Sequence, residues 1–235
     1  MLETKFLYLA LMLFSLSYPL AQSFEWRLKL YTKWKFIFPA IFSMMLLFIP
    51  WDIWFTYKGI WWFSDTYTLG IKFFELPIEE WMFFVIVPYA CLFIYEVLNY
   101  FVKNDIFKPF ARSFFGILGI VLLVFSFLNF HRNYTFFTFL LCGISLFIFV
   151  WKNPIWIGRF LLAYLVVWIP FLIINGALTG AFTENPVVNY DNTQNLGIRI
   201  FTIPIEDSVY NLLKFLMVIA AYHFLQNRTK VSQPV

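Results

Sequence analysis

Seven apolar stretches dominate the sequence, and each is long enough to cross the hydrocarbon core of a membrane. A helix needs about 20 apolar residues to span a core of roughly 30 Å. The stretches lie near residues 6–22, 36–54, 77–101, 110–128, 134–151, 155–175 and 204–226. They predict an all-α membrane protein, built as a bundle of seven transmembrane helices.

The composition indicates the same class. Hydrophobic residues make up 62% of the chain and charged residues only 13%, far from the balance of a soluble domain. No stretch has the composition of a sizeable soluble domain, so chemistry done by this chain alone must take place in or at the bilayer. The first stretch also allows a signal-peptide interpretation, since Lys5 precedes it and residues 19–23 form a passable cleavage region. Its apolar run is longer than a usual signal core.

A twelve-residue segment occurs twice, at an offset of 127. Residues 69–80 read LGIKFFELPIEE and residues 196–207 read LGIRIFTIPIED, with seven identical positions. Each copy ends in Pro-Ile-Glu and a second acid, directly before an apolar stretch. This order places proline in the first turn of a helix and two carboxylates beside its N-terminus. We therefore interpret the chain as two related halves, each of which brings one acidic helix start to a shared site.

The fourth apolar stretch has no counterpart in the first half, and it explains how the halves fit together. Direct duplication of a three-helix unit would invert the second copy, whereas one extra crossing restores its direction. The sequence thus predicts two parallel three-helix repeats and one linking helix, with Pro77 and Pro204 on the same membrane face. The predicted divisions are 1–105, 106–130 and 131–235.

The net charge of +4 does not indicate a nucleic-acid partner, because the basic residues are segregated. Of the 17 Lys and Arg residues, eleven fall in connections on one predicted side, five fall on the other side, and Lys214 lies inside a helix. The positive-inside rule then places the N-terminus outside and the C-terminus in the cytoplasm of a bacterial-type inner or plasma membrane.

Four acidic residues at the repeated helix starts are the candidate catalytic groups: Glu79, Glu80, Glu206 and Asp207. A carboxylate at a helix N-terminus is also explained by the helix dipole alone. However, two matched pairs are predicted at hydrocarbon depth, where ionisable groups are costly and usually functional. Carboxyl groups crowded into a poorly solvated site share protons. An acid held in this way suits proton donation to a poor base such as an alkene.

Further polar and aromatic residues are candidates for contact with a substrate or a cation. Asp207, Asn211 and Lys214 share one face of the last predicted helix. Lys214 lies within that helix and therefore either pairs with the acids or extends toward the interface. The other candidates are Asp52, Trp61, Trp62, Trp81 and Asn175. For the tryptophans, an interfacial belt or core packing is the simpler interpretation.

The sequence carries no pattern for a metal or a nucleotide. Its two cysteines, Cys91 and Cys142, and its two histidines, His131 and His223, have no ligand spacing. Glycine-rich phosphate-binding motifs and the G-x-S-x-G motif are absent from the sequence. We therefore expect no cofactor and no metal.

Two groups of motifs resemble the small integral-membrane lycopene cyclases. Residues 50–56 (PWDIWFT), 59–61 (GIW), 76–84 (LPIEEWMFF) and 88–90 (PYA) are similar to the first half of that family. Residues 175–180 (NGALTG), 186–188 (PVV) and 203–207 (IPIED) are similar to the second half, which is a separate subunit in some members. The resemblance covers nearly the whole chain and implies a fused form that contains both halves.

The resemblance implies a lycopene β-cyclase, which closes the open ends of lycopene to β-rings, giving γ-carotene and then β-carotene. The reaction needs an acid, a base and a dry cavity, without net oxidation or reduction. On this interpretation Glu79 and Glu206 donate and accept the proton, in an unassigned order, and Glu80 and Asp207 tune or relay it. Tryptophan faces would stabilise cationic character. The expected partners are the lipid-soluble carotenoid, membrane lipid and other carotenoid enzymes.

Other functions stay open at this point. Within the family, a cyclase of C50 carotenoids or an enzyme forming an ε-type ring fits the same motifs. A proton-coupled carrier also fits, because parallel repeats with acidic residues suit alternating access. Against a carrier, the acids cluster at one membrane face rather than at the midplane. The sequence does not determine whether one or both substrate ends react, which acid donates, or the oligomeric state.

Overall fold

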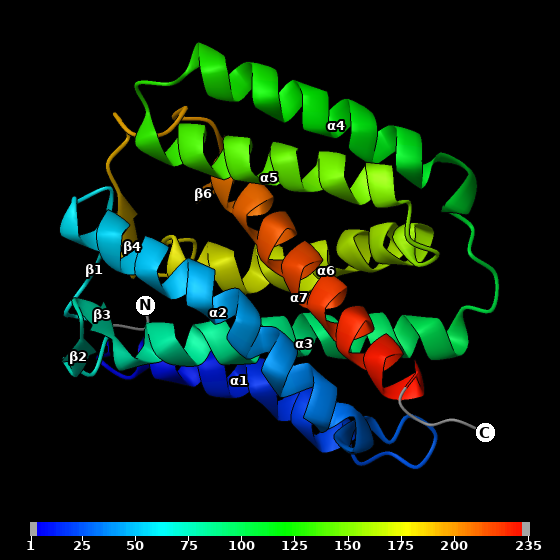
Figure 1. Ribbon diagram of the computed structural model, residues 1–235. Coiled ribbons are helices and arrows are strands. Elements are labelled where there is room, and N and C mark those ends of the chain that lie inside the picture. The colour runs from blue at the N-terminus through cyan, green and yellow to red at the C-terminus, as the bar shows by residue number, and fades with distance from the viewer. Residues whose placement is uncertain (1–3, 232–235) are drawn as a thin grey trace.

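The computed structural model describes residues 4–231, and within them the chain forms a bundle of seven α-helices (Figure 1). The helices are α1 (Leu7–Gln22), α2 (Trp34–Tyr57), α3 (Ile78–Phe101), α4 (Lys108–Leu128), α5 (Asn133–Lys152), α6 (Ile157–Leu178) and α7 (Ile205–Val231), with a short 3₁₀ turn, η1 (Leu30–Lys33), before α2. Six of them are long and apolar enough to cross a membrane, and α1 is a shorter apolar helix of 16 residues. The predicted all-α membrane fold is confirmed.

Successive helices alternate in direction, so that α3 and α7 begin at the same end of the bundle (Figure 1). Short strands gather at that end: β1 (Trp61–Phe63), β2 (Lys72–Phe73), β3 (Leu76–Pro77), β4 (Val188–Tyr190), β5 (Arg199–Ile200) and β6 (Ile203–Pro204). The strands β1 and β4 pair antiparallel, which joins the long connection of the first half to that of the second. The prediction that Pro77 and Pro204 lie at one end is confirmed.

The two copies of the repeated segment fold in the same way. Lys72 pairs with Pro77 in one hairpin, and Arg199 pairs with Pro204 in the other. Both hairpins turn through a phenylalanine with positive φ, 51° at Phe74 and 56° at Phe201. The segment is therefore a tight hairpin that leads directly into a helix, and its glycine lies just before the first strand with positive φ, as Gly70 does at 78°.

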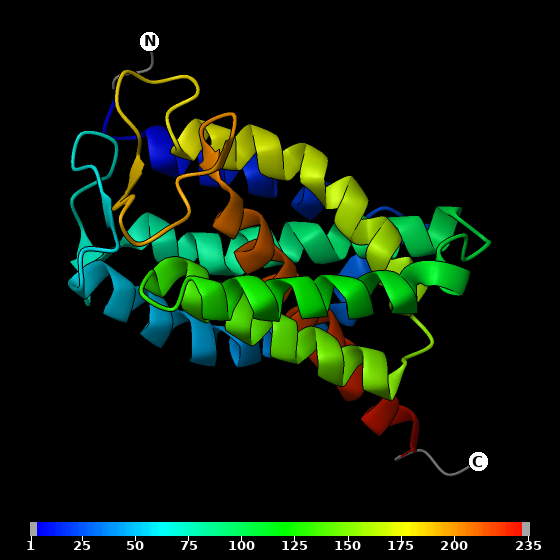
Figure 2. The same cartoon turned by 90° about the horizontal axis from the view of Figure 1, so that it is seen from above.

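Helix α4 is the linking element and packs along α5 on the outside of the bundle (Figures 1 and 2). Two glycines permit the close approach of these helices. A Cβ atom on Gly143 would lie 2.8 Å from the Leu123 side chain and 3.2 Å from the Gly119 carbonyl oxygen. Small residues at such a crossing allow helix backbones to pack tightly in lipid. The division of the chain at residues 105 and 130 stays a prediction.

At the opposite end of the bundle, two side-chain contacts join α3 to α7. The offset of 127 relates Tyr95 to Tyr222 and Glu96 to His223, so the two contacts are equivalent. The Tyr95 hydroxyl lies 2.7 Å from Nε2 of His223, and the Tyr222 hydroxyl donates to Glu96 at 2.6 Å. Lys33 also forms an ion pair with Glu96. These contacts therefore join the duplicated helices at this end, and Glu96 lies far from the repeated helix starts.

Candidate active site

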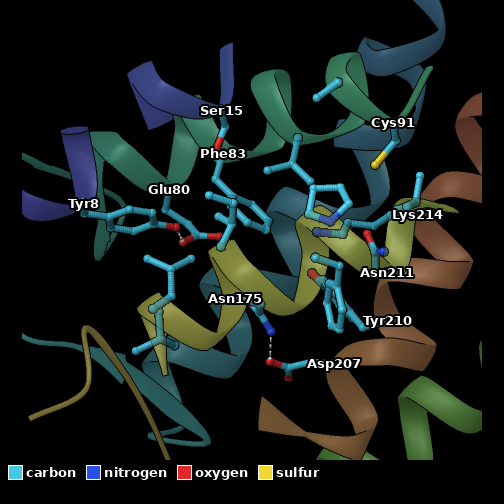
Figure 3. Close-up of a pocket in the computed structure, with 18 of the residues that line it drawn as sticks. Tyr8, Ser15, Glu80, Phe83, Cys91, Asn175, Asp207, Tyr210, Asn211 and Lys214 are labelled. Atoms are coloured by element: carbon cyan, nitrogen blue, oxygen red, sulfur yellow. Dashed lines mark hydrogen bonds between the residues drawn. The ribbon is translucent and has the colours of Figure 1, made fainter. Parts of the chain in front are cut away.

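A cavity of about 420 Å³ lies between the two halves, near the end where α3 and α7 begin (Figure 3). Its size is within the range of small-molecule sites. Most of its wall is apolar, and it receives side chains from α1, α2, α3, α5, α6 and α7. Among the predicted site residues, the cavity brings together Asp52, Trp61, Glu80, Asn175, Asp207, Asn211 and Lys214.

The first acid of each repeated pair holds its own hairpin. Oε1 of Glu79 accepts the Leu69 amide at 2.8 Å, and Oε1 of Glu206 accepts the Leu196 amide at the same distance. Glu206 also accepts the hydroxyl of Thr135 at 2.6 Å. Both carboxyl groups are fully buried, and neither lines the cavity. Their neighbours within the described residues are therefore mainly the backbone that leads into the helix.

The second acid of each pair lines the cavity, Glu80 from α3 and Asp207 from α7 (Figure 3). Adjacent residues on a helix point in directions about 100° apart, so one acid of a pair can bond its hairpin while the next faces the cavity. Oε2 of Glu80 accepts the hydroxyl of Tyr8 from α1 at 2.5 Å. The pair motif thus separates into a structural position and a cavity position.

Asp207 receives three hydrogen bonds. Tyr134 donates to Oδ1 at 2.5 Å, while Asn175 and Tyr190 donate to Oδ2 at 2.6 Å and 2.9 Å. Three donors match the acceptor-only character of a carboxylate. Tyr190 lies on β4, outside the spans, and burial together with the nearby Asp207 carboxyl raises its pKa well above the usual range. Its phenol therefore stays protonated and remains a donor.

Oε2 of Glu79 and Oε2 of Glu206 are buried without a hydrogen-bond partner within the described residues, and so are two atoms beside the cavity acids: Oδ2 of Asp52 and the hydroxyl of Tyr210. Asp52 and Tyr210 line the cavity. Buried polar groups are normally satisfied, so unpaired ones at a cavity wall indicate where a bound molecule or water would be placed.

Lys214 neither pairs directly with an acid nor extends to the interface. Its side chain is 2% exposed, and no carboxylate of the described residues lies within 4.0 Å of its ammonium group. Nζ instead lies over aromatic rings, 4.1 Å from the centroid of Phe83 and 5.0 Å from that of Tyr210. Cation–π contacts of this kind are worth more when they are desolvated.

The three candidate tryptophans lie in different environments. Trp61 lines the cavity, packs between Phe55 and Tyr134 at centroid distances of 4.9 and 5.1 Å, and donates to Thr56. Trp62 is 47% exposed and Trp81 donates to a hairpin carbonyl, and neither lines the cavity. The two residues outside the cavity fit the simpler interpretation as belt or packing residues.

The sequence interpretation missed four tyrosines that shape the site: Tyr8, Tyr134, Tyr190 and Tyr210. Nothing in the sequence distinguishes them from the other nine tyrosines of the chain. Tyr8 and Glu80 are 72 residues apart, and Tyr134 and Asp207 are 73 apart. Only the packing of α1 against α3 and of α5 against α7 shows that Tyr8 and Tyr134 have equivalent roles as donors to the two cavity acids.

Within the described part of the chain, no group of three His, Cys, Asp or Glu side chains could hold a metal ion. The site instead offers two carboxyl groups from different helices, phenol donors behind them, and aromatic faces in an apolar cavity. This set can supply a proton, accept one, and shield a cationic intermediate from water.

A family model described as lycopene cyclase matches the chain over residues 5–98 and 131–225. The two matched segments contain the two copies of the repeated hairpin and helix start. No curated protein and no solved structure matches the chain.

Proposed function

The chain belongs to the lycopene cyclase family, and on that premise we propose that it closes the open ends of lycopene to β-rings. Membership of this family supports the activity of a carotenoid cyclase in general. The observation that supports an acid–base reaction is that Glu80 and Asp207, from equivalent positions of the two halves, line one apolar cavity.

The proposed reaction conserves atoms and electrons. A carboxylic acid protonates the terminal double bond of the substrate, which leaves a tertiary cation. A neighbouring double bond attacks the cation, forming the ring bond and moving the positive charge to a ring carbon. A carboxylate then removes a ring proton, and the electrons of that C–H bond become the ring double bond. One proton enters, one proton leaves, and the product is an isomer of the substrate.

We assign the proton donor to Glu80 and the acceptor to Asp207. A donor must carry a proton before the reaction. Within residues 4–231 Glu80 accepts one hydrogen bond, from Tyr8 to Oε2, and its second oxygen can hold the proton. An acceptor must begin as a carboxylate, and three donors converge on Asp207. Hydrogen bonds to an ionised acceptor are stronger than those between neutral groups.

We propose that Glu79 and Glu206 act indirectly, because they hold the hairpins next to the cavity and do not line it. Each holds the hairpin that sets the start of its helix, and therefore the position of the acid that follows it. This arrangement exchanges the roles expected from the sequence, in which these first acids carried the proton.

The remaining cavity residues have proposed roles in binding and shielding. The faces of Trp61 and Tyr210 lie where they can stabilise cationic character. Asn175 orients Asp207. Asp52, Asn211 and Lys214 form the polar part of the wall and balance its charge.

Expression in a bacterium that accumulates lycopene tests the proposal. We expect red colonies to turn orange or yellow, and extracted pigment to contain γ-carotene and β-carotene. Rings of ε type, or cyclisation only of a C50 carotenoid, would correct the product assignment. Colonies that stay red although the protein is present in the membrane would contradict the cyclase and favour a carrier.

A further inference from the structure

The cavity extends from the acids toward the outside of the bundle along α1. Six residues of this helix contribute to its wall: Tyr8, Phe14, Ser15, Ser17, Tyr18 and Pro19. Phe14 is 68% exposed and Tyr18 is 65% exposed, although both lie in the apolar middle of the helix. The cavity is also lined from α6 by Pro170, Phe171 and Ile174. Side chains that border both the cavity and the lipid-facing surface mark an opening between α1 and α6.

The equivalent junction of the second half, between α2 and α5, is filled. The ring of Phe137 on α5 packs against Trp54 and Phe55 on α2, at centroid distances of 5.1 and 6.3 Å. Phe137 lies three residues beyond Tyr134, and the residue three beyond Tyr8 on α1 is Leu11, which has no ring to fill the gap. Only Tyr134 of α5 reaches the cavity wall. The duplicated bundle is therefore closed on one side and open on the other.

The linking helix reinforces this difference. Helix α4 lies along α5, whereas α1 lacks such a covering helix within the described chain (Figure 2). Because α4 has no counterpart in the first half, α5 is covered on its outer side and α1 is not.

The opening lies close to the acids along α1. Ser15 is seven residues beyond Tyr8, the partner of Glu80, and therefore roughly 10 Å farther along α1. In Figure 3, Ser15 lies at the α1 side of the cavity, across from Tyr210 and Asn211. An apolar chain whose end reaches Glu80 could thus leave the bundle sideways without passing through water.

We propose that the gap between α1 and α6 is the entry and exit port for the carotenoid, and that Ser15 is a positioning residue in its wall. This inference rests on the proposed function. One end of the polyene lies at Glu80 and Asp207 while the remainder extends through the port into the lipid. The second end then meets the acids only after the molecule has left and entered again.

The port is tested first by filling it. Ser15→Trp places a large ring between the helices, and we expect kcat/KM for lycopene in liposomes to fall by about tenfold or more, mainly through KM. Leu13→Trp is the matched control, because Leu13 lies on the same helix, is 52% exposed and does not line the cavity. Equal losses in Ser15→Trp and Leu13→Trp, or no loss in either, would overturn the port.

A second measurement does not depend on turnover. A photoreactive benzoylphenylalanine at Tyr18 or Phe14, in a Glu80→Gln background, should cross-link lycopene in the membrane, and the same group at Leu13 should cross-link mainly lipid. Equal lycopene cross-linking at all three positions would refute a defined port. If the wild-type protein does not cyclise lycopene, the proposed function fails, and the cross-linking pattern still decides whether a polyene occupies the gap.

Discussion

Replacing each acid of one pair by its amide distinguishes the two roles that the structure gives to adjacent residues. In Glu80→Gln, the amide oxygen still accepts the hydrogen bond from Tyr8, so packing is preserved. The amide cannot donate a proton to an alkene. General acid–base catalysis contributes about 10²- to 10⁴-fold to a rate. We therefore expect turnover to fall by that factor, which is about 3 to 5 kcal/mol in activation free energy.

In Glu79→Gln, the amide oxygen can still accept the Leu69 amide at the position that Oε1 occupies. The hydrogen bond to the hairpin is kept, so we expect a loss of no more than about 1 kcal/mol in the stability of the hairpin. Turnover should remain within a few-fold of wild type. Glu79→Ala leaves the Leu69 amide without its partner and should lower both stability and turnover.

The assay is ring formation from lycopene in isolated membranes, with pigment separated by chromatography and each rate divided by the amount of inserted protein. The second half provides a matched pair, Asp207→Asn and Glu206→Gln, for which we expect the same order. A folded Glu79→Gln protein without activity, next to an active Glu80→Gln protein, would refute the assignment of the proton to the cavity-facing acid.

Four further outcomes follow from the structure. Cysteines introduced near Gly70 and Gly197 should react with an impermeant reagent from the same side of the membrane, and one near Lys33 from the other side; labelling of the first two from opposite sides would contradict parallel repeats. Tyr134→Phe removes one of three donors to Asp207 and should slow turnover by about tenfold; an unchanged rate would argue against Asp207 as the acceptor. Gly143→Leu should destabilise the protein, measured by thermal unfolding in detergent, because its Cβ would lie 2.8 Å from a side chain of α4. In deuterated water each ring should gain one deuterium, and monocyclic product should outweigh bicyclic product early in the reaction; bicyclic product alone from the first turnover would contradict release between cyclisations.

Most of the architecture could be predicted from the sequence because its causes are local or periodic. The length of an apolar stretch determines whether it can span a membrane, and seven such stretches predicted the seven helices. The repeated Pro-Ile-Glu-acid segment predicted two equivalent helix starts, since proline and carboxylates favour the first turn wherever they occur. The extra fourth crossing then required both starts to lie at one end.

Which acid faces the cavity was decided by the tertiary structure alone. Glu79 and Glu80 differ by one position, and the rotation of α3 about its axis determines which of them meets the hairpin and which meets the cavity. That rotation is set by packing against α1, α2 and α7, which the sequence of α3 does not contain. The same reason explains why Tyr8 and Tyr134 were not foreseen, and why Lys214 lies among aromatic rings rather than against a carboxylate. The sequence by itself determines the number of helices and their two acidic starts, whereas contacts between residues far apart in the chain decide which polar groups share the cavity.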